Sequence, residues 1–142
     1  MSAFFGTLAA SYAVEDTASA VLRLDNGIQA VITAHWSAAD TAESRSSVIE
    51  IGGTDGTIVS WPLHDKFSRG TLLVATPDGG RASPDETIQL PERSTHVALL
   101  DAFAAARATG QPFPITGSDG LAAQRVLEAA AESATTGRHI RP

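Results

Sequence analysis

The chain has 142 residues, of which 43% are hydrophobic and 18% charged, with a formal net charge of −6. This length suits a single domain, residues 1–142, that is large enough to form a hydrophobic core without disulfide bonds or a structural metal. The acidic balance excludes nucleic acid and anionic membranes as natural partners, because no Lys/Arg cluster exists to release counterions. The chain has no cysteine, no run of ~20 apolar residues and no signal peptide pattern, so we expect a soluble, cytoplasmic protein.

The first half of the sequence predicts β-strands. Residues 2–8, "SAFFGTL", form a short strand, and residues 17–36, "TASAVLRLDNGIQAVITAHW", form a hairpin. Asn26-Gly27 between two alternating apolar runs predicts a two-residue type I′ turn, which requires positive φ at both central residues. In that register Asp25 lies opposite Ile28.

The predicted register distributes apolar side chains over both faces of the hairpin. One face carries Val21, Ala30, Ile32, Ala34 and Trp36 with Thr17, Ser19 and Arg23; the other carries Ala18, Ala20, Leu22, Leu24 and Val31 with Gln29, Thr33 and His35. Because neither face is typical of a solvated sheet surface, we expect both to be covered.

Four further strands precede the helical region. A second hairpin is expected within residues 46–61, where Gly52, Gly53 and Gly56 surround the turn. Residues 70–76 and 86–90 are further strands, and the segments 62–70 and 76–85 are expected to be surface connections.

The last third of the sequence predicts two helices. Ser94 or Thr95 caps a helix over residues 96–109 that ends at Gly110, and Ser118 caps a second one that ends at Gly137. The expected buried stripes are Val97, Leu100, Phe103 and Ala104 in the first helix, and Ala123, Leu127, Ala130 and Ala134 in the second. Residues 138–142 add one short edge strand.

Strands followed by helices indicate an α+β fold with a largely antiparallel sheet. Two helices cover only one face of such a sheet. The other face therefore needs another sheet or a second domain.

Signals for catalysis are mostly negative. The glycine-rich residues 51–57 lie between two strands and do not open a helix, so they indicate a turn and not a phosphate cradle. The histidines His35, His64, His96 and His139 lack metal-ligand spacing, and we expect no metal site. Glu15 and Asp16 diverge if extended, which disfavours a shared-proton pair; Asp16 is expected to cap or turn the chain.

His35 and Trp36 admit two interpretations. They end a strand and point to opposite faces, so either can contact a ligand. A histidine bonded to a hydroxyl such as that of Thr33, and a tryptophan packed in the core, are the structural alternatives.

These features together resemble the C-terminal domain of the Gfo/Idh/MocA oxidoreductases, from about residue 3 to residue 141. The matching positions are Glu15, Asp16, Asn26-Gly27, Trp36, Gly52, Gly56, Phe103, Pro112, Gly117, Asp119, Gly120, Ser133 and Gly137. The resemblance implies an open-faced, mostly antiparallel mixed β-sheet with two main helices packed on one face, as in the C-terminal domains of dihydrodipicolinate reductase and glyceraldehyde-3-phosphate dehydrogenase. The exposed face would pair subunits and wall the substrate pocket.

The departures from the family pattern limit what the chain is expected to do. Complete members carry a Rossmann domain for NAD(P), a Glu-Lys-Pro segment with a catalytic lysine, and an Asp-x-x-x-His motif, all of which would lie upstream of Met1. We therefore expect no catalytic residue and no cofactor bound by this chain alone.

The resemblance implies the substrate-side and oligomerisation domain of an NAD(P)-dependent sugar or cyclitol oxidoreductase, not catalytically competent alone. A stand-alone binding or protein-interaction module derived from that family is the alternative. The expected partners are a second copy, a separate Rossmann-domain chain and a small polyol or sugar.

Two groups of residues are candidates for these contacts. His35, Trp36 and Arg23 are the substrate-facing candidates, because a sugar face stacks on tryptophan and its hydroxyls bond to His or Arg. Val21, Ala30, Ile32 and Ala34 are the candidates for a homodimer interface on the helix-free sheet face.

Overall fold

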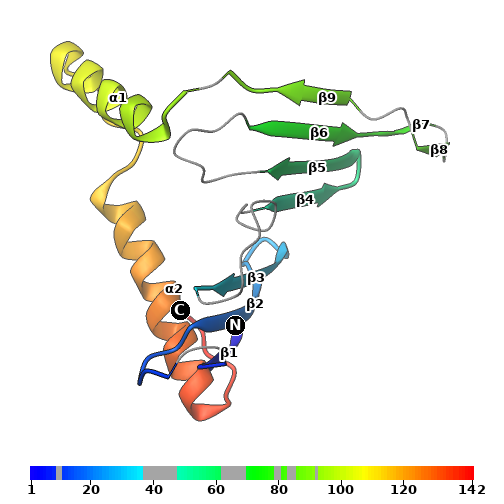
Figure 1. Ribbon diagram of the computed structural model, residues 1–142, viewed down its shortest axis with the longest axis vertical. Helices are drawn as coiled ribbons and strands as arrows, with labels where there is room; N and C mark the ends of the chain where they lie inside the picture. The colour runs from blue at the N-terminus through cyan, green and yellow to red at the C-terminus, as the bar shows by residue number, and fades with distance from the viewer. Residues whose placement is uncertain (9–10, 37–47, 62–69, 79–80, 83–85, 92) are drawn as a thin grey trace. The chain divides into compact units, whose positions relative to one another are not determined.

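The computed structural model describes residues 1–8, 11–36, 48–61, 70–78, 81–82, 86–91 and 93–142. Contacts between residues divide the chain into two compact units (Figure 1). We call residues 1–39 with 114–142 the terminal unit, and residues 40–113 the middle unit. Residues 62–69 of the predicted connection 62–70, including His64, lie outside the described residues. The single-domain expectation stays a prediction.

The terminal unit is a three-stranded antiparallel sheet with one helix. The strands are β1 (Ser2–Gly6), β2 (Thr17–Arg23) and β3 (Gln29–His35), in the order β1-β2-β3, and the helix is α2 (Gly117–Thr136). Figure 1 shows α2 beside β1, the strand with which it makes most of its contacts. The predicted strands at residues 2–8 and 17–36 are confirmed.

The core of the terminal unit is small and joins the sheet to the middle of α2. Its buried hydrophobic residues are Met1, Ala3, Leu22, Ala129 and Ala130, and Phe5, Ala20, Ala30, Val126 and Ile140 pack against them. Because the helix residues in contact are mostly alanines, the helix backbone approaches the sheet closely. Of the predicted α2 stripe, Ala130 is buried, whereas Leu127 is 60% exposed.

The turn of the β2–β3 hairpin differs from the predicted one. Arg23 lies opposite Gln29, and the amide of Leu24 donates to the carbonyl of Ile28 at 2.8 Å, so three residues form the loop. Gly27 has φ of 89°, while no described residue other than glycine has positive φ. Since type I′ also needs positive φ at Asn26, the expected turn is wrong, and a three-residue loop with glycine at its left-handed position replaces it.

This one-residue difference changes the faces of the hairpin. Val21 lies opposite Val31 and Leu22 opposite Ala30, so Ala18, Ala20, Leu22, Ala30, Ile32 and Ala34 share the face that packs on α2. Thr17, Ser19, Val21, Arg23, Val31, Thr33 and His35 share the helix-free face. The predicted grouping of Val21 with Ala30, Ile32 and Ala34 is therefore wrong, and of these four residues only Val21 faces away from the helix.

The ends of α2 are fixed by side-chain and glycine caps. Thr116, and not Ser118 as predicted, is the N-cap: its Oγ1 accepts from the amide of Asp119, whose carboxylate accepts from the amide of Thr116 at 2.7 Å. This reciprocal pair is a capping box. Gly137 ends the helix in the left-handed conformation, as predicted.

The middle unit contains a four-stranded antiparallel sheet and one helix. Its strands are β4 (Ile49–Gly53), β5 (Gly56–Trp61), β6 (Thr71–Ala75) and β9 (Glu86–Gln89), in the order β4-β5-β6-β9. The predicted strands in this region are confirmed. Within the expected connection 76–85, β7 (Pro77–Asp78) and β8 (Arg81–Ala82) form a small additional antiparallel pair.

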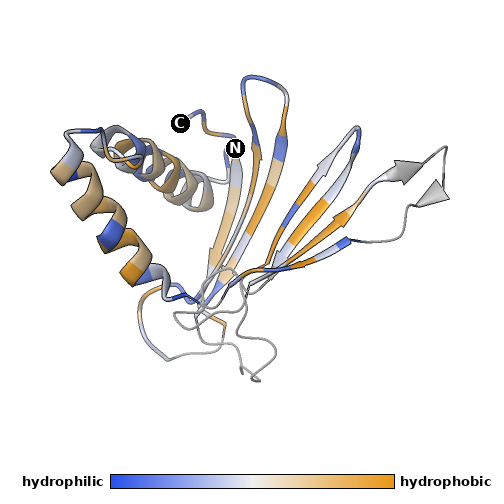
Figure 2. Ribbon diagram, turned by 90° about the horizontal axis from the view of Figure 1, so that it is seen from above, coloured by the Kyte–Doolittle hydropathy of each residue, from blue (hydrophilic) through white to orange (hydrophobic). Residues whose placement is uncertain are grey.

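One face of this sheet carries a stripe of apolar side chains. The register aligns Ile51 with Ile58, Ile58 with Val74, and Leu72 with Ile88 across the strands. Ile51 and Ile58 are 60% and 42% exposed. Hydrophobic colour follows these strands in Figure 2, while the tip of the β2–β3 hairpin is hydrophilic.

Helix α1 (Thr95–Thr109) has the predicted caps but not the predicted burial. The hydroxyl of Ser94 accepts from the amide of Val97, and Gly110 is left-handed at the C-terminus. No residue of α1 is buried, and Phe103 is 52% exposed, with its ring 5.8 Å from that of Phe113 in an edge-to-face contact. The expected buried stripe of α1 is therefore exposed in the single chain, although an α+β fold with two antiparallel sheets and two helices is confirmed.

Candidate functional site

The three predicted substrate-facing residues do not converge. Arg23 ends β2 beside the hairpin loop, whereas His35 pairs with Thr17 at the opposite end. Thr17 and Arg23 are six residue steps apart along β2, or about 20 Å at ~3.3 Å per residue. His35 is exposed, and Trp36, 86% exposed, follows the end of β3. The expected core packing of Trp36 is thus not formed in the single chain.

Asp16 has a structural position at the far end of the hairpin. It is 4% exposed, and its Oδ1 accepts from the amide of Leu8 at 2.9 Å and from the hydroxyl of Thr17 at 3.0 Å. Its amide donates to the carbonyl of Gly6 and its carbonyl accepts from the amide of Trp36, which ties the ends of β1 and β3 to the residue that precedes β2. Asp16 therefore turns the chain, as expected, while its neighbour Glu15 is exposed.

Ser133 joins α2 to both ends of the chain. It is 2% exposed; its Oγ accepts from the amide of Ala3 at 3.1 Å and donates to the carbonyl of Arg138 at 2.6 Å. Met1 and Ile140 exchange two backbone bonds beside this residue. Residues 138–142 nevertheless form no strand, so the expected edge strand is wrong. Ser133 thus has a structural role in holding the helix against the sheet.

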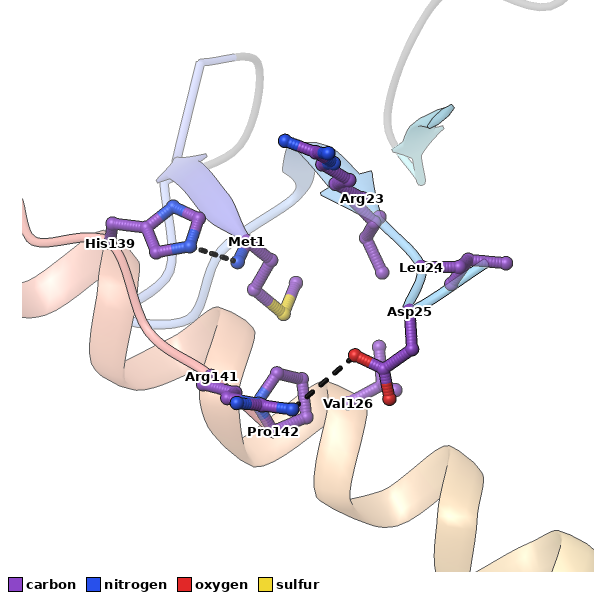
Figure 3. A pocket seen from close by; sticks show the side chains of 9 residues that line it. Met1, Arg23, Leu24, Asp25, Val126, His139, Arg141 and Pro142 are labelled. Carbon is purple, nitrogen blue, oxygen red and sulfur yellow. Dashed lines mark hydrogen bonds and ion pairs between the residues drawn. The ribbon is translucent and has the colours of Figure 1, made fainter. Parts of the chain in front are cut away.

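A pocket of about 720 Å³ lies beside the tip of the hairpin in the terminal unit (Figure 3). The lining residues come from the chain start, β2, the hairpin loop, α2 and the tail: Met1, Leu22, Arg23, Leu24, Asp25, Val126, His139, Arg141 and Pro142. The guanidinium of Arg141 lies 3.4 Å from the Asp25 carboxylate, and both side chains are strongly exposed. The ring Nε2 of His139 lies 3.3 Å from the Met1 amino nitrogen.

Sequence reasoning identified only Arg23 among the charged residues of this pocket. Asp25 and Arg141 are 116 positions apart in the chain, and no local pattern connects them. Their proximity depends on the tail returning along β1. No signal in the sequence alone therefore indicates the pocket.

The glycine-rich turn of the middle unit has a structural role in the backbone. Gly53 pairs with Gly56 across the β4–β5 turn, and Gly56 has φ of 150°. A Cβ at Gly56 would lie 2.3 Å from the carbonyl oxygen of Ala75, so glycine is required for the approach of β6. Among the described residues, no group of three His, Asp or Glu side chains is arranged to hold a metal ion.

Comparison with known proteins defines the class of this chain. Residues 4–141 match the oxidoreductase family, C-terminal alpha/beta domain. The chain therefore belongs to the Gfo/Idh/MocA oxidoreductase C-terminal domain family. No curated protein sequence matches the chain significantly.

Two solved structures share the fold. An aldose-aldose oxidoreductase from Caulobacter crescentus, complexed with glycerol, is 22% identical with a TM-score of 0.75, over 99% of this chain and 40% of its own. An oxidoreductase from Agrobacterium radiobacter, in complex with NAD+, L-tartaric acid and magnesium, is also 22% identical with a TM-score of 0.74, over 96% of this chain and 41% of its own. This chain spans about two fifths of the length of each.

The described residues do not fit a nicotinamide cofactor. A Rossmann-type dinucleotide site has a glycine-rich loop that opens a helix. Here the glycine-rich residues 52–56 close a hairpin, and the Gly56 position is filled by the approach of Ala75. The first turns of α1 and α2 are capped by Ser94 and Thr116. No step of nicotinamide chemistry is therefore assigned to these residues.

No helix in the described part of the chain is long and apolar enough to span a membrane.

Proposed function

We propose that this chain is the substrate-side and oligomerisation domain of a cytoplasmic NAD(P)-dependent sugar or cyclitol oxidoreductase and does not turn over substrate alone. The family match over residues 4–141, with coverage of only two fifths of each full-length structure, carries this proposal. The cofactor domain and the proton donor would come from other sequence, either joined to this chain or in a separate chain.

A chimera tests the proposal directly. The matching 40% of the Caulobacter enzyme is replaced by this chain, and nicotinamide oxidation or reduction is followed with aldoses, polyols and cyclitols. We expect turnover by the chimera, and none by the 142-residue chain or by the truncated Caulobacter enzyme. Turnover by this chain alone, or a folded, cofactor-binding chimera with no activity on any substrate, contradicts the proposal and favours the non-catalytic module.

The proposal includes a homodimer through an open sheet face. On the helix-free face of the terminal unit, Phe4, Val21 and Val31 are 76%, 54% and 73% exposed, and Val21 lies opposite Val31. Burying such a surface contributes about 25 cal/mol per Å². A stable interface would bury more than ~1,000 Å² in total.

Light scattering at micromolar concentration measures the association. We expect a dimer for the unmodified chain, a monomer for Val31→Asp, and a dimer for Leu127→Asp, which changes a similarly exposed residue on α2. A monomeric unmodified chain, or equal effects of both substitutions with the fold retained, contradicts the dimer through this face.

A further inference from the structure

Asn26 and Gly27 lie in the exposed loop of the β2–β3 hairpin, and Asn26 is the only asparagine in the chain. The amide of Gly27 donates to the carbonyl of Leu24 at 2.9 Å, and the amide of Ile28 donates to the side-chain Oδ1 of Asn26 at 3.2 Å. The second bond is an Asx turn, in which a side chain bonds to its own backbone two residues on. Because this bond closes a ring that contains the Gly27 nitrogen, the Asn26 side chain is folded back over that nitrogen.

The side-chain amide of Asn26 is open to attack at its carbonyl carbon, Cγ. The N–H of Ile28 donates to Oδ1, where negative charge develops when a nucleophile adds to Cγ, so this bond stabilises the adduct. The Nδ2 atom, which would leave as ammonia, has no hydrogen-bond partner among the described residues. Asn26 is also exposed, so water reaches the whole amide.

The nucleophile that this loop presents is the backbone nitrogen of Gly27. Glycine has no Cβ beside that nitrogen, and Gly27 has φ of 89°, a conformation that other residues rarely adopt. The bond to Leu24 opposes the reaction, because the Gly27 N–H must leave that carbonyl before it loses its proton. Breaking one exposed backbone hydrogen bond lowers the reactive population by no more than about tenfold.

We propose that Asn26-Gly27 is a site of spontaneous modification in the folded chain, where Asn26 converts to aspartate and isoaspartate. Hydroxide removes the Gly27 amide proton, and the nitrogen attacks Cγ, which forms a C–N bond. The Cγ–Nδ2 bond then breaks, and Nδ2 takes a proton from water and leaves as ammonia. Water opens the resulting cyclic succinimide at either carbonyl carbon, which gives the two products. The net reaction consumes water and releases ammonia, without oxidation or reduction.

The modification changes the charge and the backbone of the hairpin loop. The carboxylate of Asp25, the residue before Asn26, lies 3.4 Å from the guanidinium of Arg141, and the new carboxylate adds a second negative charge beside this pair. The isoaspartyl product also adds a backbone carbon to a three-residue loop whose bond between Leu24 and Ile28 sets the register of the hairpin. The proposal depends only on this loop and is independent of the proposed oxidoreductase role.

Mass spectrometry of the folded 142-residue chain, incubated at mildly alkaline pH, tests the site. We expect the peptide that contains Asn26 to gain the mass difference between OH and NH2 and to separate into aspartyl and isoaspartyl forms. Asp-Gly pairs elsewhere in the chain form the same ring without a change in mass, so they do not interfere. The rate should rise about tenfold per pH unit, as hydroxide does.

The same measurement in urea separates the folded loop from the free sequence. The unfolded chain should react no more than about tenfold faster than the folded chain, since one hydrogen bond has to open. If the unfolded chain reacts and the folded chain gains no mass at Asn26, the hairpin protects the pair and the proposal is overturned.

Three substitutions identify the reacting groups. Asn26→Gln keeps a side-chain amide but requires a larger ring, and it should abolish the mass gain in this peptide. Gly27→Ala places a Cβ beside the attacking nitrogen and should slow the reaction at least about tenfold. Gln124→Asn is the matched control, because it adds an exposed asparagine on α2, where the helix fixes the following backbone. An unchanged rate in Gly27→Ala, or equal mass gain at positions 26 and 124, overturns the proposal.

Discussion

The terminal and middle units have similar secondary structure but bury different amounts of it. The terminal unit contains every buried hydrophobic side chain among the described residues and two buried polar residues, Asp16 and Ser133. In the described part of the middle unit only Gly70 is buried, while its sheet exposes isoleucines on one face. Alternating apolar residues therefore form strands in both units, whereas burial of a sheet face also requires a helix or another element packed against that face.

The physical difference lies in what covers each sheet. Ala129 and Ala130 of α2 let the helix approach β1 and β2, so Leu22 and Ala3 are enclosed. In the middle unit, α1 has no buried residue, and Val97 and Leu100 are 52% and 66% exposed. We therefore expect the terminal unit to depend on its core, and the middle unit to depend on backbone pairing and on surfaces beyond the single chain.

The largest effect should come from the backbone of the middle unit. Gly56→Ala places a Cβ 2.3 Å from the Ala75 carbonyl oxygen at a φ of 150°, so β5 or β6 must move. We expect a loss of about 3 kcal/mol in the free energy of unfolding, measured by urea denaturation. Gly52→Ala is the control, because its Cβ would have no atom within 4 Å. Equal stability of the two variants would show that the turn adapts.

The next largest loss in the free energy of unfolding should come from the core of the terminal unit. Leu22, which is 8% exposed, packs against α2. We expect Leu22→Ala to lower the free energy of unfolding by about 2–3 kcal/mol, the low end for leucine truncation. Leu127→Ala, at 60% exposure on the same helix, should change stability by less than about 0.5 kcal/mol. Comparable losses for both leucines would mean that α2 buries a different face in solution.

Ser133 should show what a buried hydroxyl contributes to the same unit. Ser133→Ala leaves the amide of Ala3 and the carbonyl of Arg138 without this partner, and we expect a loss of about 2 kcal/mol. Thr135→Ala removes only an exposed hydroxyl bond to the carbonyl of Ala131 and serves as the control. Hydrogen exchange at Ala3 should accelerate in the first variant and not in the second.

The smallest effect concerns the cap of α2. Thr116→Ala should cost about 1 kcal/mol, because Thr116 is the N-cap. Hydrogen bonds from the backbone and side chain of Thr116 lower the pKa of the Asp119 carboxyl from its ordinary 3.8. The stability that the ionised Asp119 carboxylate contributes to the folded state is therefore fully present above the unfolded pKa of 3.8. It is lost as the pH falls through the lower pKa of the folded state.

Denaturation at a series of pH values separates this contribution. The loss of stability between neutral pH and pH below the folded pKa should be smaller in Asp119→Asn than in the unmodified chain. Asp25→Asn, which changes an exposed loop carboxylate, should retain the full loss. An unchanged acid dependence in Asp119→Asn would contradict the role of the capping box.

The sequence by itself determined the elements, because their signals are local. Alternating apolar residues placed the strands of both sheets, and Ser94, Gly110 and Gly137 marked three helix ends through caps that act within a few residues. The choice of Thr116 over Ser118 was missed, although the sequence contains a signal for it. Thr116 stands three residues before the acidic Asp119, the spacing of a capping box, whereas Ser118 stands three residues before Leu121.

Only the tertiary structure decided which faces are buried and which distant residues meet. The extra residue in the Asn26-Gly27 loop reversed the faces of one strand relative to the other, and strand alternation cannot reveal such a shift because its period is two. The pairing of Met1 with Ile140 and the approach of Arg141 to Asp25 arise from packing across the whole chain. The candidate pocket depends on these long-range contacts. They are stabilised by tertiary packing, and no local pattern in the sequence indicates them.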